Sequence, residues 1–282
     1  MRMQGDNGKM IYELDRPGYE KARPLFRALE YQLTSAAVLD GNNPGKVFVD
    51  DRSNPQTAFL ASPEGCYLAG NPDNGAFNRA LNHAIFVGQV FGWKPRALFL
   101  VCHPAGWQKQ LEVVLAPYQP IALPRRHYIC RKVRYDWRTN VPADLTVHRI
   151  DEPLLNRPGL VIPDHLKGWG ENNWGSMASF LRNGFGFATV HQDEIVSWSL
   201  ADCRSGDACE IGIHTAEAFR RRGLAAITVA AAVDFALSHG FSAVGWHCSL
   251  DNLGSMGTAE KVGFEKERDY TLHYVIVEKE IA

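Results

Sequence analysis

Residues 209–240 constrain the fold of this chain more than any other part of the sequence. They begin with an apolar segment of strand character, 211–215, cross an arginine-rich turn, and continue as an alanine-rich segment of helical character. Where a strand turns through small residues into a helix, the first backbone N–H groups of the helix have no partner within it and lie at the positive end of its dipole. The segment therefore predicts an anion-binding turn.

The residues of this turn favour a pyrophosphate as the anion. A run of three arginines, 220–222, precedes Gly223, so mobile positive charges accompany the fixed backbone donors. The turn has neither the Gly-Lys-Ser/Thr of a Walker loop nor the Gly-x-Gly-x-x-Gly of a dinucleotide loop. Its pattern is Arg220-x-x-Gly223-x-Ala225. The alternative is that the arginines are only the solvated start of a helix.

A second pattern follows the predicted helix at a fixed distance. A predicted strand at 243–249 leads to Asn252-x-x-Ser255 and to a predicted helix, 253–262, that closes on Gly263-Phe264. In order and spacing, the two patterns resemble the two signatures of the GCN5-related N-acetyltransferases (GNAT). The resemblance covers residues 143–282, and shorter matches such as Trp246-x-Cys248 make it similar to a bacterial two-domain GNAT subfamily.

The resemblance implies an α/β fold of the α+β kind, with a mixed, mostly antiparallel sheet whose central strands splay in a V. We expect residues 143–282 to form the acetyltransferase domain and residues 1–142 to form a degenerate GNAT-like copy, because the order of predicted elements recurs. The polar stretch 134–143 is the predicted linker. Where the first half should have its pyrophosphate turn, residues 70–75 include an aspartate and no arginine, so only the second half is expected to bind the cofactor.

The remaining elements follow from hydrophobic spacing and from Gly, Pro and Asn clusters. Helices are expected at 19–39, 76–91 and 105–115, and at 152–182 with a break around 163–173. Strands are expected at 47–49, 57–61, 66–69, 97–102, 127–133, 145–150, 185–191, 195–201 and 270–278.

The end of the predicted sheet lacks one strand. Eighteen residues follow Phe264, which is enough for one long strand but not for the hairpin that usually closes this fold. An open edge strand is a pairing hazard. We therefore expect the missing strand to come from the N-terminal half or from a second copy of the protein, which makes a homodimer one of the partners considered.

The resemblance implies acetyl-CoA as the cosubstrate. Its pantetheine would lie between the diverging strands 211–215 and 243–249 and pair with backbone groups as an added strand would. The pyrophosphate would lie at the turn. The predicted cofactor-binding residues are Ile213, Thr215, Arg220, Arg221, Arg222, Gly223, Leu224, Ala225, Ala226, Asn252 and Ser255. No metal ion is expected.

Acetyl transfer to an amine needs a base for the ammonium proton, donors for the oxyanion and a proton source for the thiolate. Backbone N–H groups at 213–215 are the expected oxyanion donors. The predicted bases are Glu210 and His214, which share a face of one strand, and His247 on the neighbouring strand. The alternatives are that Glu210 pairs with a nearby arginine and that the two histidines only pack within the sheet.

The proton source departs from the family pattern. The tyrosine that often protonates the thiolate corresponds to Ala259 in this sequence, so the predicted replacements are Ser255, Tyr270 and Tyr274, or water. The missing tyrosine also supports an alternative function, a catalytically silent acyl-CoA-binding regulatory or sensor module. Cys248 is expected to pack in the core, because direct transfer is the habit of the superfamily.

The acceptor amine, a small molecule or a protein amino group, is not identified by the sequence. Residues 169–174 fall where the family's acceptor loop lies, and their two tryptophans and one carboxylate would suit an amine with an apolar part. The alternative is that both tryptophans cover the core.

Composition excludes several other classes of protein. The 30 basic and 31 acidic residues nearly cancel, which argues against a nucleic-acid partner. No apolar run approaches the roughly 20 residues needed to span a bilayer, and residues 1–10 lack the apolar core of a signal peptide. The six cysteines contain no Cys-x-x-Cys pair. We expect a cytoplasmic protein with no membrane partner.

Overall fold

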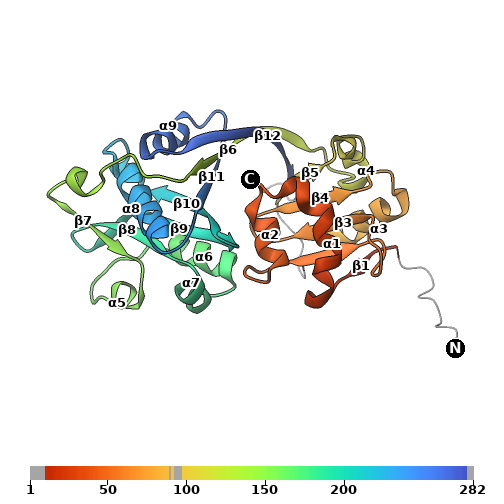
Figure 1. Cartoon of the computed structure of the whole chain (residues 1–282), viewed down its shortest axis with the longest axis horizontal. Coiled ribbons are helices and arrows are strands. Elements are labelled where there is room, and N and C mark those ends of the chain that lie inside the picture. The colour runs from red at the N-terminus through yellow and green to blue at the C-terminus, as the bar shows by residue number, and fades with distance from the viewer. Residues whose placement is uncertain (1–9, 89, 92–96, 278–282) are drawn as a thin grey trace. The chain divides into compact units, whose positions relative to one another are not determined.

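The structure, a computed structural model of the chain, describes residues 10–88, 90–91 and 97–277. It contains two compact units (Figure 1). Unit 1 comprises Met1–Gly41, Gly45–Leu123 and Thr271–Ala282, and unit 2 comprises Asn42–Pro44 and Pro124–Tyr270. Residues 1–10, which were expected to lack a signal peptide, fall outside the described residues except for Met10. No helix among the described ranges has both the length and the apolar character needed to cross a membrane.

Unit 1 is a sheet with strand order β1-β2-β3-β4-β5-β12, in which the pair β4/β5 is parallel. Phe59, Leu68, Phe77, Leu81 and Trp107 form part of its buried core. Its strands are β1 Tyr12–Glu13, β2 Lys46–Val49, β3 Thr57–Ala61, β4 Cys66–Gly70 and β5 Ala97–His103, and its helices are α1 Tyr19–Phe26, α2 Leu33–Leu39, α3 Gly75–Phe86 and α4 Leu111–Val114.

Two helices predicted in unit 1 are interrupted. The helix expected at 19–39 divides into α1, a 3₁₀ turn and α2, because Gln32 leaves the helical region with φ −97° and ψ 79°. The helix expected at 105–115 starts as a 3₁₀ helix, Ala105–Lys109, before α4. The helix expected at 76–91 ends earlier than predicted, because α3 spans Gly75–Phe86 and Val87 is its C-cap.

The N-terminus of α3 has a backbone N–H group that is hydrogen-bonded to a capping side chain. The side chain of Asn74 accepts a hydrogen bond from the backbone N–H of Phe77. A helix start capped in this way offers fewer donors to an outside anion than an uncapped one. This agrees with the expectation that the segment without arginine binds no cofactor, which stays a prediction.

Unit 2 is a sheet with strand order β12-β6-β11-β10-β9-β8-β7. The pairs β6/β11, β9/β10, β8/β9 and β7/β8 are antiparallel and β10/β11 is parallel, so the predicted mixed, mostly antiparallel sheet is confirmed. Its strands are β6 Ile121–Cys130, β7 Leu145–Arg149, β8 Gly186–His191, β9 Glu194–Ser205, β10 Ala208–Thr215, β11 Ala243–Ser249 and β12 Glu265–Ile276, and its helices are α5 Glu152–Leu155, α6 Asp164–Trp174, α7 Met177–Asn183, α8 Leu224–Ser238 and α9 Leu253–Val262.

The predicted V-shaped splay lies between β10 and β11. The two strands pair only from Ala208 with Ala243 to Glu210 with Gly245. Beyond this point β10 continues to Thr215 and β11 to Ser249, and no pairing joins them. The stretch of β10 that faces the splay therefore keeps backbone groups for a third chain, as pantetheine would require.

The missing strand of the predicted sheet is β6. It pairs with β11 through the register from Val244 with Cys130 to Ser249 with Arg125, and it lies between β11 and β12 in the strand order. The N-terminal half therefore supplies this strand, and the argument for a second copy loses its basis. The units divide at Pro124 rather than between 142 and 143, because this pairing draws β6 into unit 2.

Several further boundaries differ from the predicted ones. β6 is Ile121–Cys130 rather than 127–133, β9 is Glu194–Ser205 rather than 195–201, and β10 is Ala208–Thr215 rather than 211–215. The expected break around 163–173 is occupied by α6, and the helical segment is interrupted instead between Leu155 and Asp164. The last strand begins at Glu265 rather than at 270, and its predicted end at 278 lies outside the described residues.

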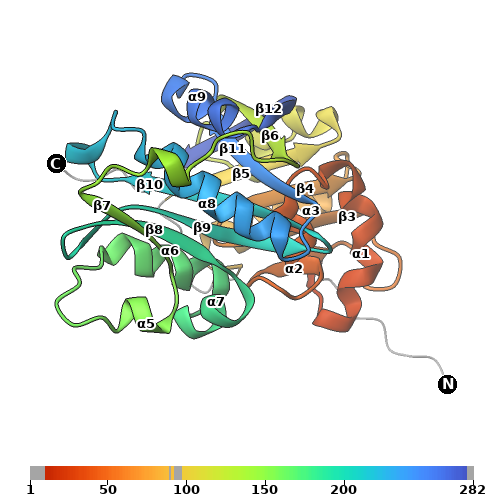
Figure 2. The ribbon, with the colours of Figure 1, turned by 60° about the vertical axis from the view of Figure 1, so that its left-hand side comes forward.

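The helices of unit 2 cover both faces of its sheet, with α8 and α6 on opposite sides of β9 in Figure 2. On the α8 side, the hydroxyl of Thr228 hydrogen-bonds to those of Ser197 and Thr189. On the α9 side, the Trp246 indole donates to the Ser255 hydroxyl at 3.0 Å. Neighbouring side chains of a strand point to opposite faces. His247 therefore faces away from α9.

Candidate active site

Two buried side chains and one that is largely buried meet where β10 and β11 separate. Glu210 belongs to the last pair of the parallel ladder, and His247 lies two residues beyond that pair on β11. His127 of β6 is the register partner of His247. The His247 Nε2 lies 3.0 Å from the Glu210 Oε1, and the two imidazole rings stack with centroids 4.4 Å apart and planes 18° from parallel. The side chains of His127, His247 and Glu210 are 5%, 14% and 9% exposed.

Gly245 makes room for this cluster. A Cβ atom on Gly245 would lie 2.8 Å from the Glu210 Cγ and 3.2 Å from the His127 Nε2. Real Cβ atoms essentially never lie as close to another atom as 2.8 Å, and the Glu210 side chain is held by its hydrogen bond with His247. The glycine therefore allows the carboxylate and both imidazoles to share one face of the sheet.

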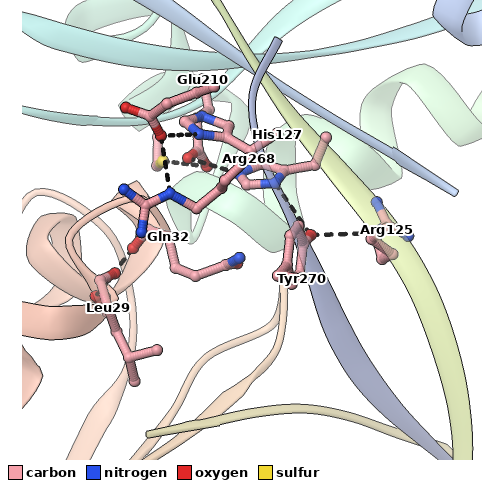
Figure 3. A network of polar contacts seen from close by, with 11 residues as sticks. Leu29, Gln32, Arg125, His127, Glu210, Arg268 and Tyr270 are labelled. Atoms are coloured by element: carbon pink, nitrogen blue, oxygen red, sulfur yellow. Dashed lines mark hydrogen bonds and ion pairs between the residues drawn. The ribbon is translucent and has the colours of Figure 1, made fainter. Parts of the chain in front are cut away.

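A hydroxyl group extends the cluster on its far side. The Tyr270 hydroxyl lies 3.0 Å from the His247 Nδ1 and accepts a hydrogen bond from the Arg125 Nε at 3.2 Å. Figure 3 shows the labelled side chains of Glu210, His127, Tyr270 and Arg125 gathered at this place. An arginine only donates, so the Tyr270 hydroxyl can direct its own proton to His247. His247 then donates its Nε2–H to the Glu210 carboxylate, which gives a chain of hydroxyl, imidazole and carboxylate.

His127 is held by a separate carboxylate. Its Nδ1 lies 2.8 Å from the Glu267 Oε2, and a carboxylate accepts, so Nδ1 carries the proton. Burial lowers the pKa of His127 and the neighbouring His247 lowers it further, against Glu210 and Glu267, which raise it. Burial raises the pKa of Glu267, but the hydrogen bond from His127 and the charges of His127 and Arg268 outweigh it, and the pKa is lowered.

The three residues also have the donor types of a transition-metal site. One ligand atom from each of His127, Glu210 and His247 lies within 4.8 Å of the other two. A metal ion binds in the plane of an imidazole ring, along the nitrogen lone pair. Because the two rings are stacked and nearly parallel, one ion cannot lie in both planes unless a ring turns. The arrangement suits proton exchange better than metal binding.

Of the three predicted bases, the structure brings Glu210 and His247 together. His214 instead lies among other rings, 4.2 Å from His165 and 5.7 Å from Trp198 between centroids. Burial lowers the pKa of His214, and the charges of His165 and Arg220 act in the same direction. His214 thus matches the packing alternative that the sequence left open.

Of the predicted proton sources, Tyr270 is the one within the cluster. The Ser255 hydroxyl accepts from Trp246 on the α9 face, opposite to the face of His247. Tyr274 belongs to unit 1, where it stacks on Phe99 with centroids 5.0 Å apart. Ala259 is fully buried, so the position of the family's tyrosine has no hydroxyl to offer.

Cys248 lies next to His247 but is unsuited to act as a nucleophile. It is buried, and burial raises the pKa of its thiol. A thiol attacks as the thiolate, which this environment disfavours. The packing role expected for Cys248 therefore agrees with its surroundings.

The predicted anion-binding turn has an open helix start. Gly223 is the N-cap of α8 with φ 81°, no side chain caps this helix, and Arg221 before it also has a positive φ of 61°. Nothing lies within 4 Å of the place where a Gly223 Cβ would stand. The first N–H groups of a 15-residue helix, those of Leu224, Ala225 and Ala226, are thus oriented for an anion.

Two of the three arginines already have partners in the chain. Arg222 donates through its Nη2 to both carboxylate oxygens of Asp144, at 2.8 and 3.1 Å, and its guanidinium lies over the Phe219 ring. This hydrogen bond holds the pKa of Asp144 below its ordinary value. Arg220 donates to the backbone carbonyl of Thr215 at 3.2 Å. An incoming phosphate would therefore compete with Asp144 for Arg222.

The other predicted cofactor residues have structural contacts as well. Ile213 and Thr215 pair with Ser199 and Ser197 of β9, which leaves their β11 side to the splay. Asn252 caps α9 by accepting from the backbone N–H of Ser255.

The two tryptophans of the predicted acceptor segment have different surroundings. Trp174 is buried and donates to the carbonyl of Ala201, so it covers the core. Trp169 is 36% exposed and donates to the Asp202 Oδ1 at 2.6 Å. A Cβ on Gly212 of β10 would meet the Trp169 ring at 2.8 Å. Of the two tryptophans, Trp169 is thus the one with an exposed side chain.

His127 is the site residue that the sequence did not reveal. It lies on a strand that was predicted, at 127–133, but assigned to the N-terminal half. The sequence did indicate that the sheet of the second half lacks one strand. That observation could have drawn attention to the residues of the strand that fills the gap. A histidine on that strand would have been a candidate once β6 was placed beside β11.

Known proteins resemble this chain along nearly its whole length. A model of the family described as GNAT acetyltransferase matches residues 23–273. A Bacillus subtilis (strain 168) protein named "Uncharacterized N-acetyltransferase YdfB" is 25% identical over 266 residues, which are 94% of this chain and 98% of that protein.

Solved structures share its fold. A GCN5-related N-acetyltransferase-like protein from Streptococcus suis 89/1591 superposes with a TM-score of 0.69 at 21% identity, over 92% of this chain and 98% of that chain. A tandem GNAT protein from the clavulanic acid biosynthesis pathway superposes with a TM-score of 0.58 at 11% identity, over 96% of this chain and 100% of that chain.

Proposed function

Because the chain belongs to the GNAT acetyltransferase family and is an N-acetyltransferase, we propose that it transfers the acetyl group of acetyl-CoA directly to an amine, with unit 2 holding both the cofactor and the reacting groups. The observation that carries this proposal is the pair of Glu210 and His247, 3.0 Å apart where β10 and β11 separate. A buried carboxylate on an imidazole is an arrangement suited to accept a proton at neutral pH.

The proposed path of acetyl-CoA follows the splay. Pantetheine would pair with the β11-facing backbone of Ile213 and Thr215, and the pyrophosphate would accept from the N–H groups after Gly223. The unpaired stretch of β10 and the uncapped start of α8 support this path. The thioester would then lie near the apex, beside Glu210 and His247.

The proposed chemistry is direct transfer. The amine attacks the thioester carbonyl, and backbone N–H groups at 213–215 stabilise the oxyanion. His247, oriented and charge-balanced by Glu210, is the side chain that holds the positive charge after the attacking nitrogen has lost its proton. Most of the rate would come from holding the two substrates in line.

A catalytically silent acyl-CoA sensor is the second candidate. The buried Ala259, in place of the family's tyrosine, favours it. The presence of the Tyr270 hydroxyl at 3.0 Å from His247 weighs against it, because a proton source is still available.

Thiol release distinguishes the two candidates. Purified protein would be incubated with acetyl-CoA and a panel of small and peptide amines, and free thiol would be followed by absorbance. We expect release with at least one amine, and a loss of kcat of about 10²–10⁴-fold in Glu210→Gln with the Kd for acetyl-CoA nearly unchanged. The matched control is Glu217→Gln, at an exposed position. Tight binding of acetyl-CoA without thiol release from any amine would instead identify a sensor.

A further inference from the structure

The Tyr270 hydroxyl stands at the end of a hydrogen-bonded chain of the kind that activates a hydroxyl. Its oxygen lies 3.0 Å from the His247 Nδ1, and the other nitrogen of that ring lies 3.0 Å from the Glu210 Oε1. Hydroxyl, imidazole and carboxylate in this order form the arrangement of a nucleophile or a proton carrier with its base and its orienting group. A phenol is a poor nucleophile toward a thioester but a good proton carrier, so the second role is the relevant one.

We propose that Tyr270 is the group that touches the reacting atoms, and that it serves as both the base and the acid of the reaction by exchanging its proton with His247. The inference rests on the proposed acetyl transfer and assigns its proton steps. It accounts for the lack of a hydroxyl at Ala259, because β12 rather than α9 would supply the tyrosine.

The steps balance without any further reactant. The amine nitrogen forms a bond to the thioester carbon, which gives a tetrahedral intermediate with a protonated nitrogen. The Tyr270 oxygen takes that proton while its own proton moves to the His247 Nδ1, and Glu210 stabilises the resulting imidazolium. The C–S bond then breaks, the thiolate takes a proton from Tyr270, and His247 returns its proton to the tyrosine. The products are the amide and the free thiol, and all three side chains end as they began.

Two neighbouring groups hold the carrier in place. Arg125 donates to the Tyr270 oxygen at 3.2 Å, which fixes the direction of the hydroxyl. His127 stacks on the His247 ring at 4.4 Å and is itself held by Glu267 at 2.8 Å, which fixes the ring plane. The Tyr270 ring meets the His247 ring edge-on, with an interplanar angle of 89°. Arg125 and His127 are therefore positioning residues.

Several charged and titratable groups on the surrounding strands affect the hydrogen-bonded series Tyr270, His247 and Glu210. β6 contributes Arg125 and His127, β10 contributes Glu210, and β12 contributes Glu267 and Arg268. From β9, Cys203 places its thiol 3.5 Å from the Glu210 Oε2. The pH dependence of the rate is thus a property of the whole cluster, so the part that Tyr270 plays in it is the difference between the parent protein and the variant.

The test compares Tyr270→Phe with Tyr274→Phe in the thiol-release assay. Tyr274 stacks on Phe99 and is absent from the cluster, so its variant controls for the loss of a β12 hydroxyl. We expect Tyr270→Phe to lower kcat by about 10²–10⁴-fold, with the Kd for acetyl-CoA within twofold of the parent value and with an altered pH profile. Tyr274→Phe should retain the parent kcat and the parent pH profile.

A double-variant cycle tests the carrier role against a merely structural one. If Tyr270 and His247 act as one unit, Tyr270→Phe combined with His247→Gln should be no slower than the worse single variant, whereas independent effects would multiply. Arg125→Lys should restore most of the activity lost in Arg125→Ala, because it keeps a donor beside the phenol.

The outcomes separate the inference from the proposed function. An active parent enzyme with a Tyr270→Phe variant of equal kcat and equal pH profile overturns the proton-carrier role and leaves the acetyl transfer in place. Multiplying effects in the double variant overturn it as well. A parent protein that binds acetyl-CoA but releases no thiol with any amine overturns the proposed function, and the inference falls with it.

Discussion

Asp144 is the residue whose contact bears most directly on cofactor affinity. It holds the Arg222 guanidinium through two hydrogen bonds at 2.8 and 3.1 Å. The phosphate groups of a cofactor at the start of α8 would have to draw Arg222 away from this carboxylate. Asp144 therefore limits the positive charge that Arg222 can offer to a phosphate at the turn.

We expect Asp144→Asn to bind acetyl-CoA severalfold more tightly than the parent protein, because Arg222 is released from its partner. Calorimetric titration with acetyl-CoA measures the effect. Asp193→Asn, which removes the partner of Arg157 in a comparable exposed ion pair, is the matched control and should not change the Kd. Equal affinity in the two variants would show that Arg222 does not reach the cofactor.

Gly223→Val should lose acetyl-CoA binding although the chain has open space at that position. A β-branched residue at φ 81° is strained by about 1–2 kcal/mol or more, and relief of the strain would turn the N–H groups of the helix start. Gly206→Val is a suitable control, because Gly206 has φ 55°, equally open space and a place in the turn between β9 and β10. The prediction is contradicted if both variants fold and bind acetyl-CoA with the same affinity.

The buried His127 should make the free energy of unfolding depend on pH. Its pKa is lowered by burial and by His247, so the unfolded chain binds its proton more readily, at a pKa of about 6.5. The free energy of unfolding should therefore be fully retained above about pH 7.5 and should fall as the pH drops below about 6.5, since the unfolded state binds more protons there.

The measurement is the melting temperature between about pH 5 and 8 for the parent protein and His127→Gln. The variant should lose part of this slope and keep the rest, because the pKa values of His214 and His273 are also lowered by burial. Carboxylates with lowered pKa values, such as Glu267, lose their stabilisation only at a lower pH, below about 4.5. An unchanged slope in the variant would mean that His127 does not titrate in this range.

At the scale of elements, α8 is attached to the sheet by hydroxyl groups as well as by apolar packing. Thr228 of α8 hydrogen-bonds to Thr189 of β8 at 2.7 Å and to Ser197 of β9 at 3.2 Å, and all three residues are fully buried. Buried hydroxyls without partners destabilise a fold by about 1–3 kcal/mol. The attachment matters for function because α8 begins at the anion-binding turn.

Thr228→Val should lower the free energy of unfolding by about 1–3 kcal/mol, because it leaves Thr189 and Ser197 with fewer partners in a dry environment. Urea denaturation followed by circular dichroism measures the change. Thr258→Val on α9, whose hydroxyl donates to the backbone carbonyl of Gly254 in its own helix, should change stability far less. If the Thr228→Val protein is as stable as the parent, the hydroxyl network does not contribute to the stability of the fold.

Elements with local patterns were predictable, and elements fixed by distant pairing were not. Both β11 and α9 have the predicted bounds, because the apolar run at 243–249 and the residues Asn252 and Gly263 mark their ends locally. β6 was expected to belong to the N-terminal half, because nothing in its own residues records that it pairs with β11. The candidate bases Glu210 and His247 and the candidate proton source Tyr270 were predicted from the sequence, whereas His127 was not, because its place beside His247 depends on the order of strands in the sheet.

At the scale of the whole molecule, the boundary of unit 2 decides which fragments fold. Residues 143–282, the domain expected from the sequence, lack β6, so β11 and β12 would each lose a neighbour in the sheet. The fragment would also lack Arg125 and His127 of the active site. We expect this fragment to be aggregated or unfolded.

A fragment of residues 124–282, which keeps the part of β6 that pairs with β11, should show more cooperative thermal unfolding than residues 143–282. Circular dichroism and size-exclusion chromatography compare the two. A folded, acetyl-CoA-binding fragment of residues 143–282 would contradict the role assigned to β6.

The shared strand β12 also sets the order in which this protein can form during synthesis. Its first residues lie in unit 2 beside β6, and residues 273–276 pair with β5 in unit 1. A nascent chain that has emerged from the ribosome only as far as Phe264 therefore leaves both β5 and β6 with an open edge, which is the state most prone to pair with other chains. The sheet of unit 1 cannot receive β12 beside β5 until translation has passed residues 273–276, so we infer that the edge of β5 needs protection until almost the entire polypeptide has been made.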